Sequence, residues 1–286
     1  MARASAMDRG QVTEGRAEAV FAVDAEGRSY LARQYASYPF HLCRAQYLDS
    51  DQPDLASLYL QSSAGGLFAG DRLTITLTTE AGARAHVTTQ ASTIAYRMAD
   101  GEAQQTVELA VGPDSLLEYL PDPTILFPQA RLRSRLSLQL AAGARAIVGE
   151  AFLPHDPGGV AEPFGCFESE TLVMTRSGEL MALDRFRVTG SEINARSVGA
   201  NGRFAMQGTL LLLGEEFAAA STCEALRGTL ATHPAVYGGV SALPNAAGTW
   251  ARLLAAEGAA LTAAMTALWS AARYRLTGHV PERRRK

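Results

Sequence analysis

The sequence is poor in cysteine and has no long apolar run. Its three cysteines, Cys43, Cys166 and Cys223, are far apart, and no Cys-x-x-Cys pair occurs. This pattern supports neither a disulfide framework nor a structural zinc site, and it is typical of a reducing compartment. No stretch approaches the ~18 apolar residues of a membrane-spanning helix, and residues 1–10 lack the apolar segment of a secretory signal. We therefore expect a cytoplasmic protein without a membrane partner.

Neither sign of charge dominates the chain. The 26 basic and 29 acidic side chains give a net charge of −3, and 47% of the residues are hydrophobic. A dedicated nucleic-acid binder usually has a basic footprint, so we expect no nucleic-acid partner. The apolar fraction is too high for a disordered chain. We expect a folded domain with a sizeable core.

Common catalytic and nucleotide-binding motifs are also missing. Gly65 and Gly70 have the spacing of a phosphate-binding loop, but Asp71 stands where a lysine is needed. A carboxylate there would repel phosphate, and the following residues resemble a strand where the motif requires a helix. The five histidines are dispersed, and no Gly-x-Ser-x-Gly, His-Glu-x-x-His or Gly-x-Gly-x-x-Gly segment occurs. These absences exclude nucleotide binding in this loop and the hydrolase chemistries that depend on those motifs.

An alternation of period two dominates residues 15–213. Leu73, Ile75 and Leu77 alternate with threonines, and similar runs recur at 107–111 and 136–140, separated by Gly, Pro and Asp turns. Alternation of this kind places one face of each strand against a core. Many short strands at this spacing predict an all-β body.

The period changes near residue 214. Residues 214–233 and about 249–276 have apolar side chains at three- and four-residue steps, which predicts helices, and Gly258 interrupts the second stretch. We interpret residues 1–286 as a single domain, with a β-rich body over about 15–213 and a mixed, partly helical part over about 214–278.

Three acidic residues occur in unusual contexts. Asp71 follows a glycine-rich turn, Glu150 lies in the apolar run AIVGEAF, and Glu162 lies in a Gly/Pro-rich connection. A carboxylate in an apolar segment must be paired, hydrated or bound to a metal, because burying it bare is costly. The plainer interpretations are a turn-forming aspartate at Asp71 and an ion-paired glutamate at Glu150.

A further group alternates along one predicted strand. Cys166, Glu168 and Glu170 would share one face if residues 166–174 form a strand. Sulfur and oxygen ligands together could hold a borderline transition metal. The alternative, which the spacing favours, is a solvent-facing acidic edge beside a chance thiol.

Three segments resemble the urease accessory protein UreD family, also called UreH. They are AGGLFAGDRL at 64–73, VTTQASTIAYR at 87–97 and LEYLPDPTILFPQA at 117–130, and they occur in the family's order. The resemblance covers about residues 30–187, with a looser helical match to about 278. The chain departs from the family's pattern at Ile94-Ala95, at His155-Asp156, and at Pro281-Glu282, where the usual terminal tryptophan is missing.

The resemblance implies a mainly β fold of helically stacked strands with a few helices toward the C-terminus. It also implies a non-enzymatic scaffold that binds apo-urease subunits. With UreF, and through UreF with the GTPase UreG, such a scaffold supports GTP-dependent nickel insertion. Asp71, Glu150 and Glu162 fall at acidic positions that the family uses along a proposed internal nickel path. Sparse carboxylates give weak serial sites, so we expect transient Ni²⁺ and no tightly bound cofactor.

Two other functions fit the residues. Asp71 and Glu150 could act as the paired carboxylates of a β-fold polysaccharide hydrolase or lyase. The chain could also be a purely structural interaction module, because the apolar helical stretches could end at an interface. The hydrolase hypothesis explains the acidic residues but not the apolar helices, and no run of substrate-stacking aromatic residues occurs.

Overall fold

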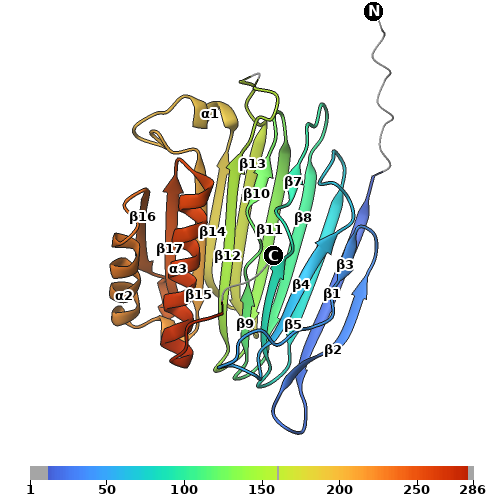
Figure 1. Ribbon diagram of the computed structural model, residues 1–286, viewed down its shortest axis with the longest axis vertical. Coiled ribbons are helices and arrows are strands. Elements are labelled where there is room, and N and C mark those ends of the chain that lie inside the picture. Colours follow the sequence, from blue (N-terminus) through green and yellow to red (C-terminus); the bar gives the residue numbers. More distant parts are fainter. Residues whose placement is uncertain (1–11, 160, 283–286) are drawn as a thin grey trace, which may run out of the picture.

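The computed structural model describes residues 12–159 and 161–282. It consists of two β-sheets that face each other, with helices on the outer side of one sheet (Figure 1). Residues 1–10, which lack the apolar segment of a secretory signal, lie outside the described part.

Seven strands form the first sheet, sheet A, in the order β14-β13-β11-β8-β5-β1-β2. They are β1 (Glu14–Val23), β2 (Ser29–Ala36), β5 (Arg72–Thr79), β8 (Ala103–Val111), β11 (Arg131–Leu140), β13 (Cys166–Thr175) and β14 (Leu180–Val188).

Ten strands form the second sheet, sheet B, in the order β16-β17-β15-β12-β9-β6-β4-β3, with β10 paired to β12 and β7. They are β3 (Phe40–Leu42), β4 (Ala56–Ser62), β6 (Arg84–Thr89), β7 (Ile94–Ala95), β9 (Leu116–Tyr119), β10 (Thr124–Leu126), β12 (Arg145–Pro154), β15 (Met206–Leu213), β16 (Val236–Ala242) and β17 (Gly248–Ala255).

The chain alternates between the two sheets as it advances. The strands β5, β8, β11 and β13 are paired in parallel in sheet A, and β4, β6, β9 and β12 are paired in parallel in sheet B. Each turn of the coil thus adds one strand to each sheet. The predicted mainly β fold of helically stacked strands is confirmed.

The period-two pattern fills the space between the sheets. Leu77, Leu109 and Leu138 of sheet A face Val87 and Val148 of sheet B in one continuous buried cluster. Burying such side chains contributes roughly 1.5–3 kcal/mol each. The alternating leucines in the sequence therefore define the inner face of the coil.

The helices α2 (Ala220–Ala231) and α3 (Gly258–Thr277) cover sheet B at its C-terminal end (Figure 1). The short helix α1 (Gly190–Asn194) lies at one end of the sandwich, where Ile193 joins a cluster with Phe167, and η1 (Glu215–Phe217) and η2 (Pro244–Ala246) are short 3₁₀ turns. A second buried cluster joins α3 to β15 and β17 through Leu210, Leu253, Leu261 and Leu268. Close packing of α3 depends on Gly208, where an added Cβ would lie 3.0 Å from Leu261 and Met265.

The predicted helix at 249–276 is wrong in its first third. Residues 248–255 form β17, which pairs with β15 on one side and β16 on the other, and α3 begins at Gly258. The spacing of Trp250, Leu253 and Leu254 fits a helix only over a short window. In the fold one face of this strand is buried against the helices through Ala251, Leu253 and Ala255. The opposite face is half-buried and also carries the apolar Trp250 and Leu254, so apolar residues do not alternate with polar ones.

The helix predicted over 214–233 begins later than expected. Gly214 has a φ of 125°, which L side chains rarely adopt, and it turns the chain into η1. The helix α2 then starts at Ala220, so Glu215 and Glu216 precede it and do not belong to its first turn.

Candidate functional site

One layer of the core is polar. In sheet A the inward-facing residues Gln105, Ser134 and Ser169 lie side by side on β8, β11 and β13. In sheet B, Glu150 of β12 is paired with Thr209 of β15. The Ser169 hydroxyl donates a hydrogen bond of 2.6 Å to the Glu150 carboxylate. This contact joins the two sheets across the space between them.

The neighbouring layers are apolar. Phe152 lies two residues from Glu150 on β12, and Phe167 lies two residues from Ser169 on β13. Both belong to an aromatic and aliphatic cluster at one end of the sandwich. On the other side, Val148 and Leu138 belong to the main inter-sheet core. The polar layer is thus a defined interruption of the core.

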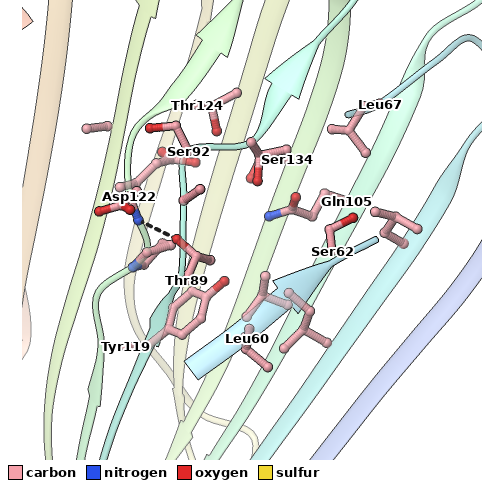
Figure 2. A pocket seen from close by; sticks show the side chains of 18 of the residues that line it. Leu60, Ser62, Leu67, Thr89, Ser92, Gln105, Tyr119, Asp122, Thr124 and Ser134 are labelled. Carbon is pink, nitrogen blue, oxygen red and sulfur yellow. Dashed lines mark hydrogen bonds between the residues drawn. The ribbon is translucent and has the colours of Figure 1, made fainter. Parts of the chain in front are cut away.

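A cavity of about 340 Å³ lies at this layer. Its polar lining consists of hydroxyls, amides and the carboxylates of Asp122 and Glu150, and among the described residues no lysine, arginine or histidine lines it. Figure 2 shows Gln105, Ser134 and Tyr119 turned toward the same hollow. The rest of the lining is apolar, and the oxygen atoms of the polar part, which have no basic side chain among them, are of the kind that hard or borderline divalent cations prefer.

Glu150 is the acidic centre of this cavity. Burial raises its pKa, while hydrogen bonds from the Ser169 and Ser134 hydroxyls oppose the rise. Burial, together with the charge of Glu150, also raises the pKa of Tyr119 above its ordinary value. The carboxyl group is therefore held in an environment that penalises its charge, and a passing cation would relieve that penalty.

Sheet B is interrupted beside Glu150. Within the described chain, β12 pairs with β9 as far as Val148 and with β10 from Phe152 onward, and residues 149–151 have no ladder partner on that side. The connecting residues 120–123 contain Pro121 and Pro123, which have no N–H to donate to a ladder. The two prolines explain why the sheet opens here.

A groove lies on the other side of this opening. Its volume is about 670 Å³, and it runs between α3 and the residues 120–123. The residues 121–122 and 149–151 line both the groove and the inter-sheet cavity. The charged side chains of its lining are all acidic in the described chain: Asp122, Glu150 and Glu282. Glu150 thus stands where two hollows meet.

Asp71 has the turn-forming contacts that the plainer interpretation predicts. Its two carboxylate oxygens accept hydrogen bonds from the Thr13 and Phe68 backbone N–H groups, at 3.0 and 2.8 Å. The side chain is buried and lines neither hollow. Its place on a nickel path stays a prediction.

Glu162 lies in the connection between β12 and β13, outside both hollows. Its carboxylate forms an ion pair with Arg97 and accepts a hydrogen bond from the Gln129 amide. These contacts hold the connection against the neighbouring turns. A metal role for Glu162 also stays a prediction.

The alternating group on β13 is neutralised by arginines. Cys166, Glu168 and Glu170 do share a face, as the predicted strand requires. Glu168 is bound by Arg133 and Arg187, each at 3.2 Å, and Glu170 by Arg185. No group of three or more His, Cys, Asp or Glu side chains in the described chain is arranged to hold a metal ion.

A buried ionic network joins residues that no sequence motif connects. Glu118 of β9 accepts hydrogen bonds from the Arg273 guanidinium and, at 3.0 Å, from the Trp269 indole N–H. A further hydrogen bond of 2.7 Å joins its carboxylate to the His86 ring. Arg273 also donates to Asp49 at 2.7 Å. The only sequence signal was a glutamate inside the apolar run LLEYL. This network fixes α3 to sheet B.

The residues at which the chain departs from the family pattern make defined contacts in the fold. Ile94 and Ala95 form β7 and pair with β10. Asp156 accepts hydrogen bonds from two backbone N–H groups of its own turn. The Glu282 N–H donates to Asp49 at 2.7 Å, which ties the C-terminal segment to the buried network.

No helix in the described part of the chain is long and apolar enough to cross a membrane.

Comparison with known proteins identifies the family. The family model described as "UreD urease accessory protein" matches residues 13–286. The chain is 40% identical to "Urease accessory protein UreD 1" of Pseudomonas syringae pv. syringae, with 96% of each chain covered. It is 40% identical to the protein of the same name from Methylorubrum populi, covering 91% of this chain and 88% of the relative. Against "Urease accessory protein UreD" of Natronomonas pharaonis the identity is 34%, with 97% and 92% covered. Because these matches extend over nearly its whole length, the chain belongs to the UreD family of urease accessory proteins, which are not themselves enzymes.

Proposed function

We propose that this chain is a non-enzymatic scaffold of urease maturation. In this proposal it binds apo-urease subunits and UreF, and UreG joins through UreF, so that GTP hydrolysis drives nickel insertion. The family match supports the coarse role. Nickel is cargo in this scheme, and no tightly bound cofactor is needed.

The proposal gives the polar layer a specific task, which is to pass nickel ions between the two hollows at Glu150. The observation that carries it is the position of Glu150 at the opening in sheet B, shared by the cavity and the groove. A single carboxylate with hydroxyl and amide neighbours can stabilise Ni²⁺ as it sheds water. It also lacks the histidine and cysteine ligands that would retain the ion.

The structure argues against the hydrolase alternative, which needs Asp71 and Glu150 as a pair of catalytic carboxylates. Asp71 is buried, each of its oxygens accepts a backbone N–H hydrogen bond, and it lines neither hollow, so it does not face a space in which a substrate could meet it together with Glu150. The interaction-module alternative differs from our proposal only in nickel passage. A variant that keeps the assembly but loses nickel delivery separates these two.

The scaffold role is tested by reconstitution. Apo-urease subunits, UreF and UreG are co-expressed with and without this chain, and nickel per urease active site is measured after purification. We expect nickel loading and recovery of a complex containing UreF to require the chain, and loading to require GTP. Full loading in the absence of the chain would overturn the proposal.

Asp71 and Glu162 are tested in the same system. Asp71→Asn removes the charge but keeps an oxygen for one of the two backbone N–H groups, and Glu162→Gln retains the shape of the side chain. If either residue is a stepping site, urease nickel falls while the complex still forms. If the residues only support loops, nickel content follows the amount of folded chain recovered.

A further inference from the structure

Arg252 lies in the polar layer beside Glu150. It is paired with Thr209 on β15, and Thr209 is paired with Glu150 on β12, so the three occupy one row of sheet B. Two strand spacings put Glu150 and Arg252 about 10 Å apart along this row. The guanidinium forms an ion pair with Asp184 of β14, which belongs to sheet A. The pair therefore bridges the two sheets at the β14–β17 side.

Aromatic rings hold the guanidinium in place. Its carbon lies 4.6 Å from the Trp250 ring centre and 5.3 Å from that of Phe186. The Arg252 Nε is buried and has no hydrogen-bond partner among the described residues. Planar stacking of this kind is specific to arginine, so the positive charge occupies a fixed position.

A third hollow of about 270 Å³ adjoins this bridge. Asp184 and Trp250 line it, and it shares Thr171 and Leu211 with the inter-sheet cavity. Thr171 and Leu211 thus lie between the cavity at Glu150 and the hollow at Asp184. Glu150 lines the first of these hollows and Asp184 the second, and the charge of Arg252 acts on Glu150 while its guanidinium forms an ion pair with Asp184.

Without a resident positive charge, this arrangement would trap divalent cations. Glu150 lies beside the Ser134 and Ser169 hydroxyls, and Asp184 lines the adjoining hollow with Thr171, so hard oxygen atoms that suit divalent cations occur in both hollows. Two carboxylates bind a divalent ion far more tightly than one. A chain that passes nickel onward must avoid such a trap.

We propose that Arg252 is the positioning residue that keeps the passage weakly binding. This inference rests on the proposed function. Arg252 neutralises Asp184, repels cations from the β14–β17 side and leaves Glu150 as the single stepping carboxylate. Its action is electrostatic and passes through Asp184 and Glu150, since Arg252 lines neither the cavity nor the groove.

The test measures nickel affinity directly. Ni²⁺ is titrated into the full-length chain, purified with UreF, by calorimetry. Arg252→Met removes the charge and retains apolar volume, and we expect Ni²⁺ to bind roughly 10- to 100-fold more tightly. Arg252→Lys should keep the weak binding. Adding Asp184→Asn to Arg252→Met should reverse the gain.

A matched control is Arg185→Met, which removes an exposed arginine paired with Glu170 on the outer face of sheet A. It should leave the affinity unchanged. A gain of affinity is a readout that loss of structure would not produce. Unchanged or weaker binding by a folded Arg252→Met variant overturns the inference.

A second variant covers the case in which Arg252→Met fails to fold. Asp184→Asn alone leaves the fixed guanidinium charge without its carboxylate partner, so it repels cations near Glu150 more strongly, and Ni²⁺ affinity should then fall several-fold. An unchanged affinity would overturn the inference as well. A failure of the proposed nickel passage is distinguishable from a failure of this inference. If nickel does not pass at Glu150, urease will be fully loaded with nickel when Glu150 is replaced, whatever Arg252→Met does to the Ni²⁺ affinity.

Discussion

Glu118 and Glu150 are two interior glutamates with opposite electrostatic surroundings. Burial alone would raise the pKa of Glu118, but Arg273 and His86 hold it far below its ordinary value. Glu150 faces hydroxyls with no basic group in hydrogen-bond contact, so burial prevails and its pKa rises. The ionised form of Glu118 therefore stabilises the fold, whereas ionisation of Glu150 destabilises it.

The Glu118→Gln variant should be strongly destabilised. Removing the charge leaves the Arg273 guanidinium buried with Asp49 as its remaining carboxylate partner, and breaking such a pair costs about 3–5 kcal/mol. Because the folded pKa of Glu118 is lowered, its contribution is fully present above its ordinary value of 4.5 and is lost as pH falls below it. Urea unfolding of both proteins at pH 7 and at pH 4 checks this. A small difference at pH 7 would contradict it.

The Glu150→Gln variant should be more stable than the parent chain at pH 8. A carboxyl group whose folded pKa is raised loses stability as pH rises above its unfolded value, and glutamine cannot ionise. The two unfolding curves should converge as pH falls toward 4.5. Lower stability of the variant at pH 8 would show that the Glu150 anion is held by favourable contacts and would refute the raised pKa.

Among the elements, strands were easier to predict from sequence than the C-terminal part. The alternation at Leu73–Leu77 and the strand at 166–174 were recognised because one face of each is buried and the other is polar. The strand β17 resembles a helix in sequence because its half-buried face also carries apolar residues, Trp250 and Leu254, beside the buried Leu253 of the other face. A strand with apolar residues on both faces lacks the period-two pattern that would identify it.

Contact between α3 and sheet B should be sensitive to Gly208. Gly208→Val places two methyl groups against Leu261 and Met265, where even a Cβ lies at 3.0 Å, so α3 must shift. We expect a loss of about 1–3 kcal/mol in the free energy of unfolding. The matched control is Gly239→Val on the edge strand β16, where no atom lies within 4 Å. Equal effects of the two substitutions on the thermal midpoint would argue against the close packing.

At the scale of the whole molecule, the coil brings together residues that the sequence keeps far apart. Glu118 and Arg273 are separated by 155 positions, and only the return of α3 over sheet B joins them. The polar layer could have been found in part, since Ser134 and Ser169 interrupt the inward apolar positions of their strands. Their register with each other depends on strand pairing, which no local pattern specifies.

The three acidic residues singled out in the sequence have different surroundings in the fold. All were chosen as carboxylates in unusual local contexts. Only for Glu150 does the fold place the side chain at the meeting of two hollows, whereas Asp71 supports a turn and Glu162 an interstrand connection. Local sequence reveals an unusual carboxylate but not the space that it faces.

The central claim is that nickel passes this chain at Glu150, and nickel content of urease tests it most directly. Urease is matured in cells carrying the accessory proteins with the parent chain, Glu150→Gln, or the control Glu170→Gln, whose carboxylate lies on the outer face of sheet A beside Arg185. Pull-down of the accessory complex is measured in parallel. The account predicts that Glu150→Gln keeps the complex and lowers nickel per active site several-fold, while Glu170→Gln changes neither. Full nickel loading with Glu150→Gln would contradict it.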